Sequence, residues 1–433
     1  MKKLICLIIT VLMVICNVGT TVHAINFPPI NPPSANPRGA DEEGFWTGGL
    51  YDVELPSVER ICELLEESYE LPFILYETFP ETDNPYEIGT LKEEVFQIGL
   101  KRLNFFRELL GLYNLDTQNA LNNYAQHAAL IGKVNGHISH YPIKPDDFSE
   151  ELYEYCSMAC ANSCLAGPKY DLIKAIDAYM TDHQSRRNLT SVGHRQSIMK
   201  TGMQYIGIGQ VYDFNALYIR DSSYGSLLRE WDFISYPASG NMPIVDSFWY
   251  ENTPWSLKLN LNFFKQPNID NITITIEKDS EVIWSNTGEL QLNANLLGPY
   301  MLVNTEGFAG GSHCIIFRPD VTEYTPGEYI VYVDGLRDRN NEPVDFKYKV
   351  NMFNPNEVPN PTPPEHNIPD MAFMDGNGDG IVNLVDCIIA LRCVMGLLTA
   401  DNLIYYFNLD TDGDGIVTLQ DSIQILRVVI MLS

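Results

Sequence analysis

The stretch Asp375-Gly-Asn-Gly-Asp-Gly-Ile-Val-Asn-Leu-Val-Asp386 recurs 35 residues later as Asp410-Thr-Asp-Gly-Asp-Gly-Ile-Val-Thr-Leu-Gln-Asp421. Each copy has oxygen-bearing side chains at positions 1, 3, 5, 9 and 12, and a glycine at position 6. Ca²⁺ prefers six to eight hard oxygen ligands, and this spacing supplies them around a sharp turn at the glycine. The sequence therefore predicts two calcium-binding loops.

The predicted ligands are the side chains at these five positions and the backbone carbonyl at position 7. In the first loop they are Asp375, Asn377, Asp379, Ile381, Asn383 and Asp386, and in the second they are Asp410, Asp412, Asp414, Ile416, Thr418 and Asp421. An acidic, glycine-rich loop without metal is the alternative. Two copies in register, each followed by an apolar helical segment (388–392 and 423–427), favour one Ca²⁺ ion in each loop.

The flanks of the loops make the pattern more specific. Position 12 is Asp rather than the usual Glu, and neither loop is preceded by a clear helix. Duplicated half EF-hands on a proline-rich tether resemble the dockerin module of cellulosomal proteins, in a type I-like form, over residues 371–433. This resemblance implies a small all-α calcium-binding domain that docks into a cohesin module of a scaffold protein.

The resemblance also implies which residues contact the cohesin. In the family they lie just before the last ligand and along the following helix. Here they are Leu384, Val385, Leu391 and Arg392, mirrored in the second repeat by Leu419, Gln420, Leu426 and Arg427. Leu-Val and Leu-Gln replace the small hydroxyl pair of the best-known dockerins, so the type of cohesin stays open.

Residues 1–24 have the pattern of a secretory signal peptide: Lys2-Lys3, an apolar core from Leu4 to Cys16, and a cleavage site at Ala24. A membrane anchor is the alternative, but the apolar run is shorter than the roughly 20 residues that a spanning helix needs. Removing Lys2 and Lys3 changes the formal net charge from −28 to −30. Such a charge argues against nucleic acid and anionic surfaces as partners. We expect a secreted, extracellular protein without membrane insertion.

Seven cysteines remain after residue 24: Cys62, Cys156, Cys160, Cys164, Cys314, Cys387 and Cys393. An odd number without regular spacing does not predict a disulfide framework. Cys156, Cys160 and Cys164 are spaced as one stripe of a helix. A metal or cluster site is one interpretation, and buried small apolar side chains are the favoured one. Free thiols in an exported protein weakly indicate an anaerobic bacterium.

The remaining chain divides by periodicity. Residues 25–40 are a proline-rich leader. Apolar residues at helical spacing predict helices over 91–110 and 117–134. From about residue 250 the period becomes two, in the sets Ile272, Ile274, Ile276; Tyr329, Val331, Val333; and Phe346, Tyr348, Val350, Met352. These sets predict an Ig-like β-sandwich over 240–353. Residues 354–370 are predicted to be a stiff proline-rich linker.

Two histidines lie in polar turns, His140 in Ser139-His-Tyr-Pro142 and His194 in Val192-Gly-His-Arg195, and the second turn precedes Ile206-Gly-Ile-Gly209. Together with the segments 121–129 and 178–182, this pattern resembles the CAP superfamily (cysteine-rich secretory, antigen 5 and pathogenesis-related proteins, or SCP-like) over 88–235. The resemblance implies an α-β-α sandwich with a central cleft. We place this domain, with an N-terminal helical extension, at 41–235.

The family cleft holds two histidines and two acids, which bind a divalent metal in some members. His140 and His194 match the histidines, and Asp182 matches the second acid. The first acid belongs to a Gly-Glu-Asn motif, but the corresponding stretch 159–163 has no glutamate, and candidates to replace it are Glu150, Glu151 and Glu154. Two imidazoles and one carboxylate predict weak Zn²⁺ binding. Histidines that only hydrogen-bond the cleft walls are the alternative.

Three functions follow. The favoured one is a secreted, cellulosome-associated protein that docks through its dockerin and carries a CAP-like domain with a binding or effector role rather than catalysis. The second is a cellulosomal hydrolase of plant cell-wall polysaccharide or protein, for which no carboxylate pair or nucleophile is set out by a motif. The third is carbohydrate binding by the β-sandwich, whose Trp255, Trp284, Tyr300 and Tyr329 would stack on sugars. Core packing is the alternative for these four rings.

Overall fold

The computed structural model describes residues 40–68, 71–72, 74–221, 230–248, 253–305, 313–321, 323–358, 374–377, 381–398, 408–411 and 416–432. The chain forms two compact units, Met1–Pro359 (the larger unit) and Asn360–Ser433 (the C-terminal unit), which we describe separately. The predicted signal peptide, nearly all of the leader and most of the linker lie outside the described residues. Among the described residues, no helix is long and apolar enough to cross a membrane.

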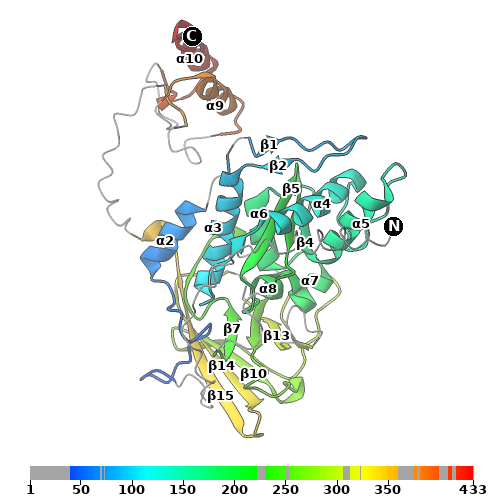
Figure 1. The fold of residues 1–433 in the computed structure, drawn as a ribbon. Coiled ribbons are helices and arrows are strands. Elements are labelled where there is room, and N and C mark those ends of the chain that lie inside the picture. The colour runs from blue at the N-terminus through cyan, green and yellow to red at the C-terminus, as the bar shows by residue number, and fades with distance from the viewer. Residues whose placement is uncertain are drawn as a thin grey trace, which may run out of the picture. The chain divides into compact units, whose positions relative to one another are not determined.

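The first half of the larger unit is mixed α/β (Figure 1). Its helices are α2 (Val58–Glu67), α3 (Glu93–Leu109), α4 (Asn119–Asn135), α5 (Glu150–Ala161), α6 (Leu172–Thr181), α7 (Arg186–Ser191) and α8 (Gly193–Ile198). Its strands are β1 (Tyr76–Thr78), β2 (Thr90–Leu91), β3 (Asp116–Thr117), β4 (Ser163–Ala166), β5 (Tyr205–Val211) and β6 (Phe214–Tyr218). The helices predicted over 91–110 and 117–134 are confirmed as α3 and α4.

A four-stranded sheet of order β3-β5-β6-β4 has helices on both faces. Two successive residues of β6 show this: Leu217 packs with α3 and α6, whereas Ala216 packs with α4 and α5. The glycines of the Ile-Gly-Ile-Gly stretch let α4 approach β5 closely. A Cβ on Gly207 would lie 2.1 Å from the Leu121 carbonyl oxygen, and one on Gly209 would lie 2.3 Å from the carbonyl carbon of Ala125.

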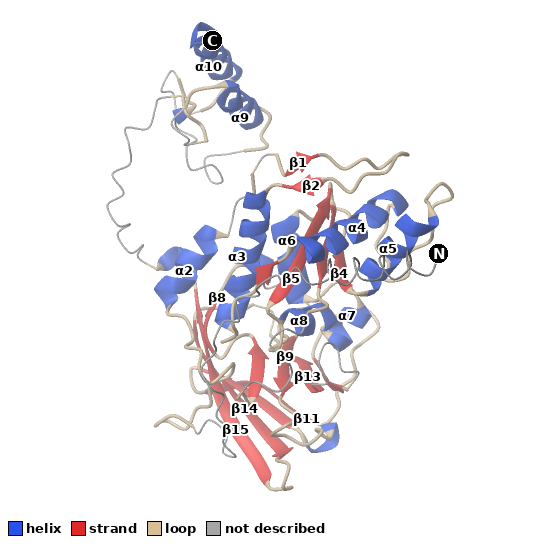
Figure 2. Ribbon diagram, viewed as in Figure 1, coloured by secondary structure: helices blue, strands red, loops and turns tan. Residues whose placement is uncertain are grey.

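The second half of the larger unit is built of strands (Figure 2). They are β7 (Phe233–Tyr236), β8 (Gly240–Pro243), β9 (Trp255–Leu259), β10 (Thr273–Lys278), β11 (Glu281–Thr287), β12 (Tyr300–Asn304), β13 (His313–Arg318), β14 (Gly327–Arg337) and β15 (Pro343–Phe353). Short 3-10 helices are η1 (Asp246–Phe248), η2 (Ile269–Asn271) and η3 (Pro355–Glu357). The strands predicted from the period of two are confirmed as β10, β14 and β15.

These strands form two sheets, β11-β10-β14-β15-β8 and β12-β13-β9-β7, that pack face to face. Aromatic pairs join the two inner faces, because Phe233 stacks on Phe346 at 4.9 Å between ring centroids and Trp284 stacks on Phe317 at 5.9 Å. β15 pairs with β8 in parallel, and the other pairings are antiparallel.

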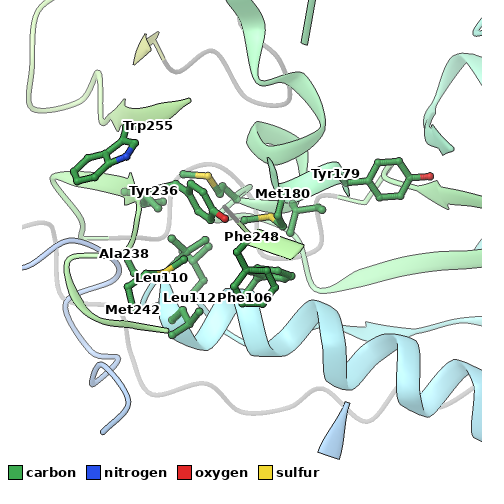
Figure 3. Close-up of a cluster of buried hydrophobic side chains, with 14 of the residues drawn as sticks. Phe106, Leu110, Leu112, Tyr179, Met180, Tyr236, Ala238, Met242, Phe248 and Trp255 are labelled. Atoms are coloured by element: carbon green, nitrogen blue, oxygen red, sulfur yellow. The ribbon is translucent and has the colours of Figure 1, made fainter. Parts of the chain in front are cut away.

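One hydrophobic core runs through both halves of the larger unit. Figure 3 shows Phe106 and Leu110 of the α3 region, Met180 of α6, Tyr236 of β7, Met242 of β8 and Trp255 of β9 in a single cluster. β7 ends one residue beyond the predicted domain limit at 235, and it pairs with β9 of the predicted sandwich. The ranges 41–235 and 240–353 therefore share one core.

The C-terminal unit contains α9 (Leu384–Val394) and α10 (Leu419–Leu432), which are the helical segments predicted after each loop. Both pack on a small core of Cys387, Ala390, Cys393, Leu409, Val417 and Ile425. The backbone N–H of Met374 donates to the carbonyl of Asn408 at 2.9 Å, which joins the starts of the two repeats. The described part of this unit is therefore a helix pair with both loops at its base.

The prediction for the cysteines needs one correction. All seven are reduced and buried, as expected for small apolar side chains. However, α5 ends at Ala161, and Cys164 lies in β4. The four-residue spacing of the cysteines therefore extends beyond the helix. Asn162 ends α5, and its N–H donates to the carbonyls of Ala159 and Cys160. Only Cys156 and Cys160 share a helical stripe.

Candidate functional site

The two predicted calcium loops end in the first turns of α9 and α10, and side chains of the loops fix these helix starts. Asn383 caps α9, since its Oδ1 accepts the N–H of Val385 at 2.7 Å, and its own N–H donates to Asp386 Oδ2 at 2.8 Å. In the second loop, the N–H and hydroxyl of Thr418 both donate to Asp421 Oδ2 at 2.7 Å. In both repeats the backbone N–H of position 9 therefore donates to the carboxylate of position 12, and in the first repeat the two residues form a reciprocal capping box.

The last carboxylate also ties back to the start of each loop. Asp386 Oδ1 accepts the N–H of Gly376 at 2.9 Å. Asp421 Oδ1 accepts the N–H and the hydroxyl of Thr411 at 2.8 and 2.6 Å. In both repeats the N–H of position 2 therefore donates to the carboxylate of position 12, which connects the two ends of each loop.

The carboxylates at positions 1 and 12 are buried. Asp375, Asp386 and Asp421 are 0% exposed, and Asp410 is 6% exposed. Burial raises the pKa of Asp386, and the nearby Asp375 raises it further, against the hydrogen bonds that lower it. For Asp421, burial is outweighed by the hydrogen bonds of Thr411 and Thr418, and the pKa is lowered to about 2.

The donor set at each loop fits Ca²⁺. Buried like charges such as Asp375 and Asp386 are unfavourable unless a cation lies between them, and carboxylate, amide and carbonyl oxygens are the ligands that Ca²⁺ takes. The predicted ligands Asp379, Asp412 and Asp414 lie outside the described residues. Those that are described lie toward the two ends of each loop, next to the starts of α9 and α10.

The predicted partner-contacting residues fall into two groups. Leu384 and Leu419 are each 54% exposed, and Val385 is 41% exposed. Gln420 is also exposed. Leu391 and Leu426 are half-buried against the core of the unit, and Arg392 is half-buried as well. The side chain of Arg427 lies outside the described residues. The exposed contacts therefore gather at the helix starts, next to the loops.

In the larger unit, the structure brings Asp182 and His194 together. Asp182 ends α6 in the left-handed region (φ 50°) and is fully buried. Its Oδ1 lies 2.8 Å from His194 Nδ1, and its Oδ2 accepts the N–H of Arg195 at 3.1 Å. The His194 side chain is 21% exposed, and its ring lies 5.1 Å from that of Tyr179. A carboxylate that accepts from Nδ1–H leaves Nε2 as the proton acceptor.

The structure does not place His140 with Asp182 and His194 as a third ligand of a metal centre. His140 Nδ1 lies 2.9 Å from the carbonyl oxygen of Cys160, at the end of α5. The substitute acids Glu150, Glu151 and Glu154 are exposed on α5, and Glu150 pairs with Lys144. In the part of the chain that the structure describes, no group of three or more His, Cys, Asp or Glu side chains is placed to hold a metal ion.

Three further residues lie beside Asp182, and the sequence did not assign any of them to this site. His183 follows it, and burial lowers the pKa of that imidazole to about 4, although Asp182 acts in the opposite direction. Cys164 lies near Asp182 in β4, and its thiol pKa is raised by burial and by the Asp182 charge. Arg195 is fully buried against the end of α6. The signal that could have identified His183 and Arg195 in the sequence is that they directly follow Asp182 and His194.

Comparison of the chain with models of known protein families finds no match, and comparison with curated proteins finds none either.

Proposed function

We propose that the C-terminal unit is a dockerin-like module that binds two Ca²⁺ ions and attaches a secreted chain to a cohesin module of a cellulosomal scaffold protein. The observation that carries this proposal is the duplication of capped, carboxylate-lined loops: the position-12 aspartates Asp386 and Asp421 are buried in both repeats and hold both ends of their loops. An acidic loop without a metal role has no need to bury its carboxylates twice at equivalent positions.

The larger unit carries the proposed cargo. Helices on both faces of the β3-β5-β6-β4 sheet, and the Asp182–His194 pair at the end of α6, support a CAP-like fold for the first half. Two sheets packed face to face support an Ig-like sandwich for the second. We propose a binding or effector role for the expected cleft: Asp182 orients the His194 ring, and within the described residues no serine or cysteine nucleophile is hydrogen-bonded to that ring.

Carbohydrate binding through the four sandwich aromatics is not supported. Trp255 and Tyr300 are 0% exposed, Tyr329 is 1% exposed and Trp284 is 8% exposed. A ring has to offer a face to solvent before a sugar stacks on it, and these rings pack in the interior. Hydrolysis of plant cell-wall polysaccharide or protein stays an alternative, and zymography of the full chain on both substrate classes tests it.

The docking proposal is tested by calcium titration of the full chain with isothermal calorimetry. We expect two bound ions for the natural chain and one for Asp386→Asn or Asp421→Asn, because each change removes one ligand charge from one loop. Asp320→Asn, an exposed carboxylate outside the loops, is the matched control and keeps two ions. If the natural chain binds no Ca²⁺, the proposal is wrong. Binding to recombinant cohesin modules in calcium, and its loss in EDTA, is the second arm.

A further inference from the structure

His194 is carried by a segment that packs against the strand half of the larger unit, which comprises β7 to β15. This segment consists of α7, one connecting residue and α8 (residues 186–198, the α7–α8 segment). In Figure 1 it lies beside β13. Its apolar side chains Leu189 and Val192 are buried in one cluster with Tyr300 of β12. The element that positions the imidazole is therefore supported from the strand half.

Hydrogen bonds fix both helices of this segment to the strand half. The buried hydroxyl of Tyr300 donates to the carbonyl of Leu189 in α7 at 2.5 Å. Arg186, at the start of α7, donates to the carbonyl of Asn293, in the loop before β12, at 2.6 Å. Lys258 of β9 donates to a carbonyl of α8 at 3.4 Å. Because each bond holds a backbone carbonyl, these contacts determine the path of the chain toward and beyond the histidine.

The residue that connects α7 to α8 has a strained backbone. Val192 lies in the left-handed region, with φ 41° and ψ 45°, which is unfavourable for a β-branched residue. Strained residues persist where surrounding contacts determine their conformation. Val192 is 0% exposed, and its cluster includes the fully buried Tyr300, Cys314 and Ile316 of the strand half. Packing on the strand half therefore offsets the strain of the turn that sets the direction of α8, two residues before His194.

We propose that the strand half positions His194. It holds the α7–α8 segment so that Nδ1–H of the imidazole meets Asp182 and Nε2 is presented to a ligand. Tyr300 and Arg186 are then positioning residues, since they act on the ring through the backbone of α7. A ligand that contacts Nε2 in this tautomer has to donate a hydrogen bond, as a hydroxyl or an amide N–H does. The inference rests on the binding role proposed above for this site, but its test observes the ring itself, so the two can fail separately.

The test uses the full chain, with Tyr300→Phe and Arg186→Met combined. Phenylalanine keeps the buried ring and removes only the hydroxyl, and Arg186 is exposed, so the fold is retained. Tyr329→Phe on β14 is the matched control, because this tyrosine is 1% exposed and its hydroxyl donates to Thr325 within the strand half. NMR with isotope-labelled histidine gives the tautomer of the His194 ring and the rate at which its Nδ1–H exchanges with solvent. Differential scanning calorimetry gives the unfolding midpoint of each protein.

We expect the natural ring to carry its proton on Nδ1, and the double variant to exchange that proton at least about tenfold faster, because two hydrogen bonds that hold α7 are lost. Tyr329→Phe should keep the natural rate, although it also loses a buried hydrogen bond and some stability. If the double variant does not fold, Arg186→Met alone decides, with an expected increase of about threefold.

Two results would overturn the inference. If the variant keeps the tautomer and the exchange rate of the control, the strand half stabilises the chain without positioning the ring. If the natural ring carries its proton on Nε2 instead, Asp182 does not hold it through Nδ1–H, and the strand half has no such pair to position. Neither result depends on whether a ligand binds, so a failure of the proposed binding role is recognised separately, by the absence of any ligand for a correctly positioned ring.

Discussion

Buried cations meet the carbonyl groups at the end of α8. Lys258 Nζ donates to the carbonyls of Met199 at 3.2 Å and Gln196 at 3.4 Å, and an Arg107 guanidinium nitrogen donates to that of Ile198 at 2.5 Å. The last carbonyls of a helix have no partner within it and carry partial negative charge, so cations are favourable there. Lys258 comes from β9, and it thereby connects the strand half of the larger unit to the helical half.

Lys258 should give the larger unit a measurable pH dependence. Burial lowers its pKa to about 8, and the neighbouring Arg107 and Lys200 lower it too, although Cys314 acts in the opposite direction. In the unfolded chain the pKa is 10.5, so between pH 8 and 10.5 the unfolded state binds more protons. The free energy of unfolding therefore rises with pH in this window, by roughly 3 kcal/mol at most from this group.

Urea unfolding of the natural chain and of Lys258→Met at pH 8 and at pH 10 measures this effect. As the pH rises, the free energy of unfolding of the natural chain should increase relative to that of the variant by about 1–3 kcal/mol. The comparison with Lys258→Met is needed because tyrosines titrate in the same range. An unchanged difference between the two proteins would mean that the pKa of Lys258 is not lowered in the folded chain, so that its amine stays charged as it is in the unfolded chain.

His140 and His194, the histidines of the expected cleft, provide a second prediction at the scale of residues. With His194 held by Asp182, and His140 bonded to the Cys160 carbonyl, we expect Zn²⁺ binding to be weak, because protein zinc sites take at least three protein ligands. Zinc titration of the full chain against His194→Ala and His140→Ala checks this. Equal uptake by all three proteins would make both histidines structural.

At the scale of elements, Arg195 joins α6 and α8 to the strand half. Its guanidinium donates to the carbonyls of Met180, Thr181 and Pro254 at 2.5, 3.0 and 2.9 Å, and to the Ser256 hydroxyl at 2.9 Å. It also lies 4.0 Å from the centre of the Tyr236 ring on β7. One side chain thus fixes the residue after His194 to two strands of the sandwich.

Arg195→Met should destabilise the larger unit by about 3–5 kcal/mol, because it leaves several buried carbonyls without a donor. Differential scanning calorimetry of the full chain checks this, with the exposed Arg339→Met as the control. In the same variant, the NMR signal of His194 Nδ1–H should shift, because the guanidinium holds the carbonyls of Met180 and Thr181, the two residues before Asp182, which accepts that proton. A stable variant with an unchanged signal would show that α8 does not need the sandwich.

The helices of the C-terminal unit carry a further prediction. With docking as proposed, the repeat-related pairs Leu391-Arg392 and Leu426-Arg427 would allow two equivalent orientations of the cohesin. Changing one pair to alanine should then weaken binding by about twofold, whereas changing both should abolish it. Biolayer interferometry with the natural chain as reference measures both. Full loss from a single pair would show that only one face is used.

The sequence predicts an element when the residue pattern within that element is enough to identify it. The period of two at Ile272, Ile274 and Ile276 identifies β10, because each isoleucine packs inward on the same sheet. Arg195 and Lys258 gave no such signal. Their role depends on partners about 60 residues away in sequence, and a lone buried cation looks like any surface cation in a sequence. The shared core across residues 235–240 was missed for the same reason.

At the scale of the whole molecule, the two units differ in what stabilises them. The larger unit has an extensive core of buried aliphatic and aromatic side chains. The C-terminal unit has a small core of Cys387, Ala390, Cys393, Leu409, Val417 and Ile425, and it buries four aspartates at its loops. With calcium bound as proposed, the ion would contribute a large share of the free energy of folding of this unit, because the ligand carboxylates repel each other without it.

Calcium removal should therefore unfold the C-terminal unit and leave the larger unit folded. The chain offers a direct way to see both, since its five tryptophans (Trp46, Trp231, Trp249, Trp255 and Trp284) all precede the C-terminal unit. In excess EDTA we expect an unchanged tryptophan emission spectrum and unfolding midpoint, together with loss of amide dispersion and rapid proteolysis within 374–433. Asp320→Asn, which keeps both loops, should behave as the natural chain does. If 374–433 keeps its amide dispersion in EDTA, calcium is not part of its fold. A shifted tryptophan spectrum would instead show that the ion stabilises the larger unit.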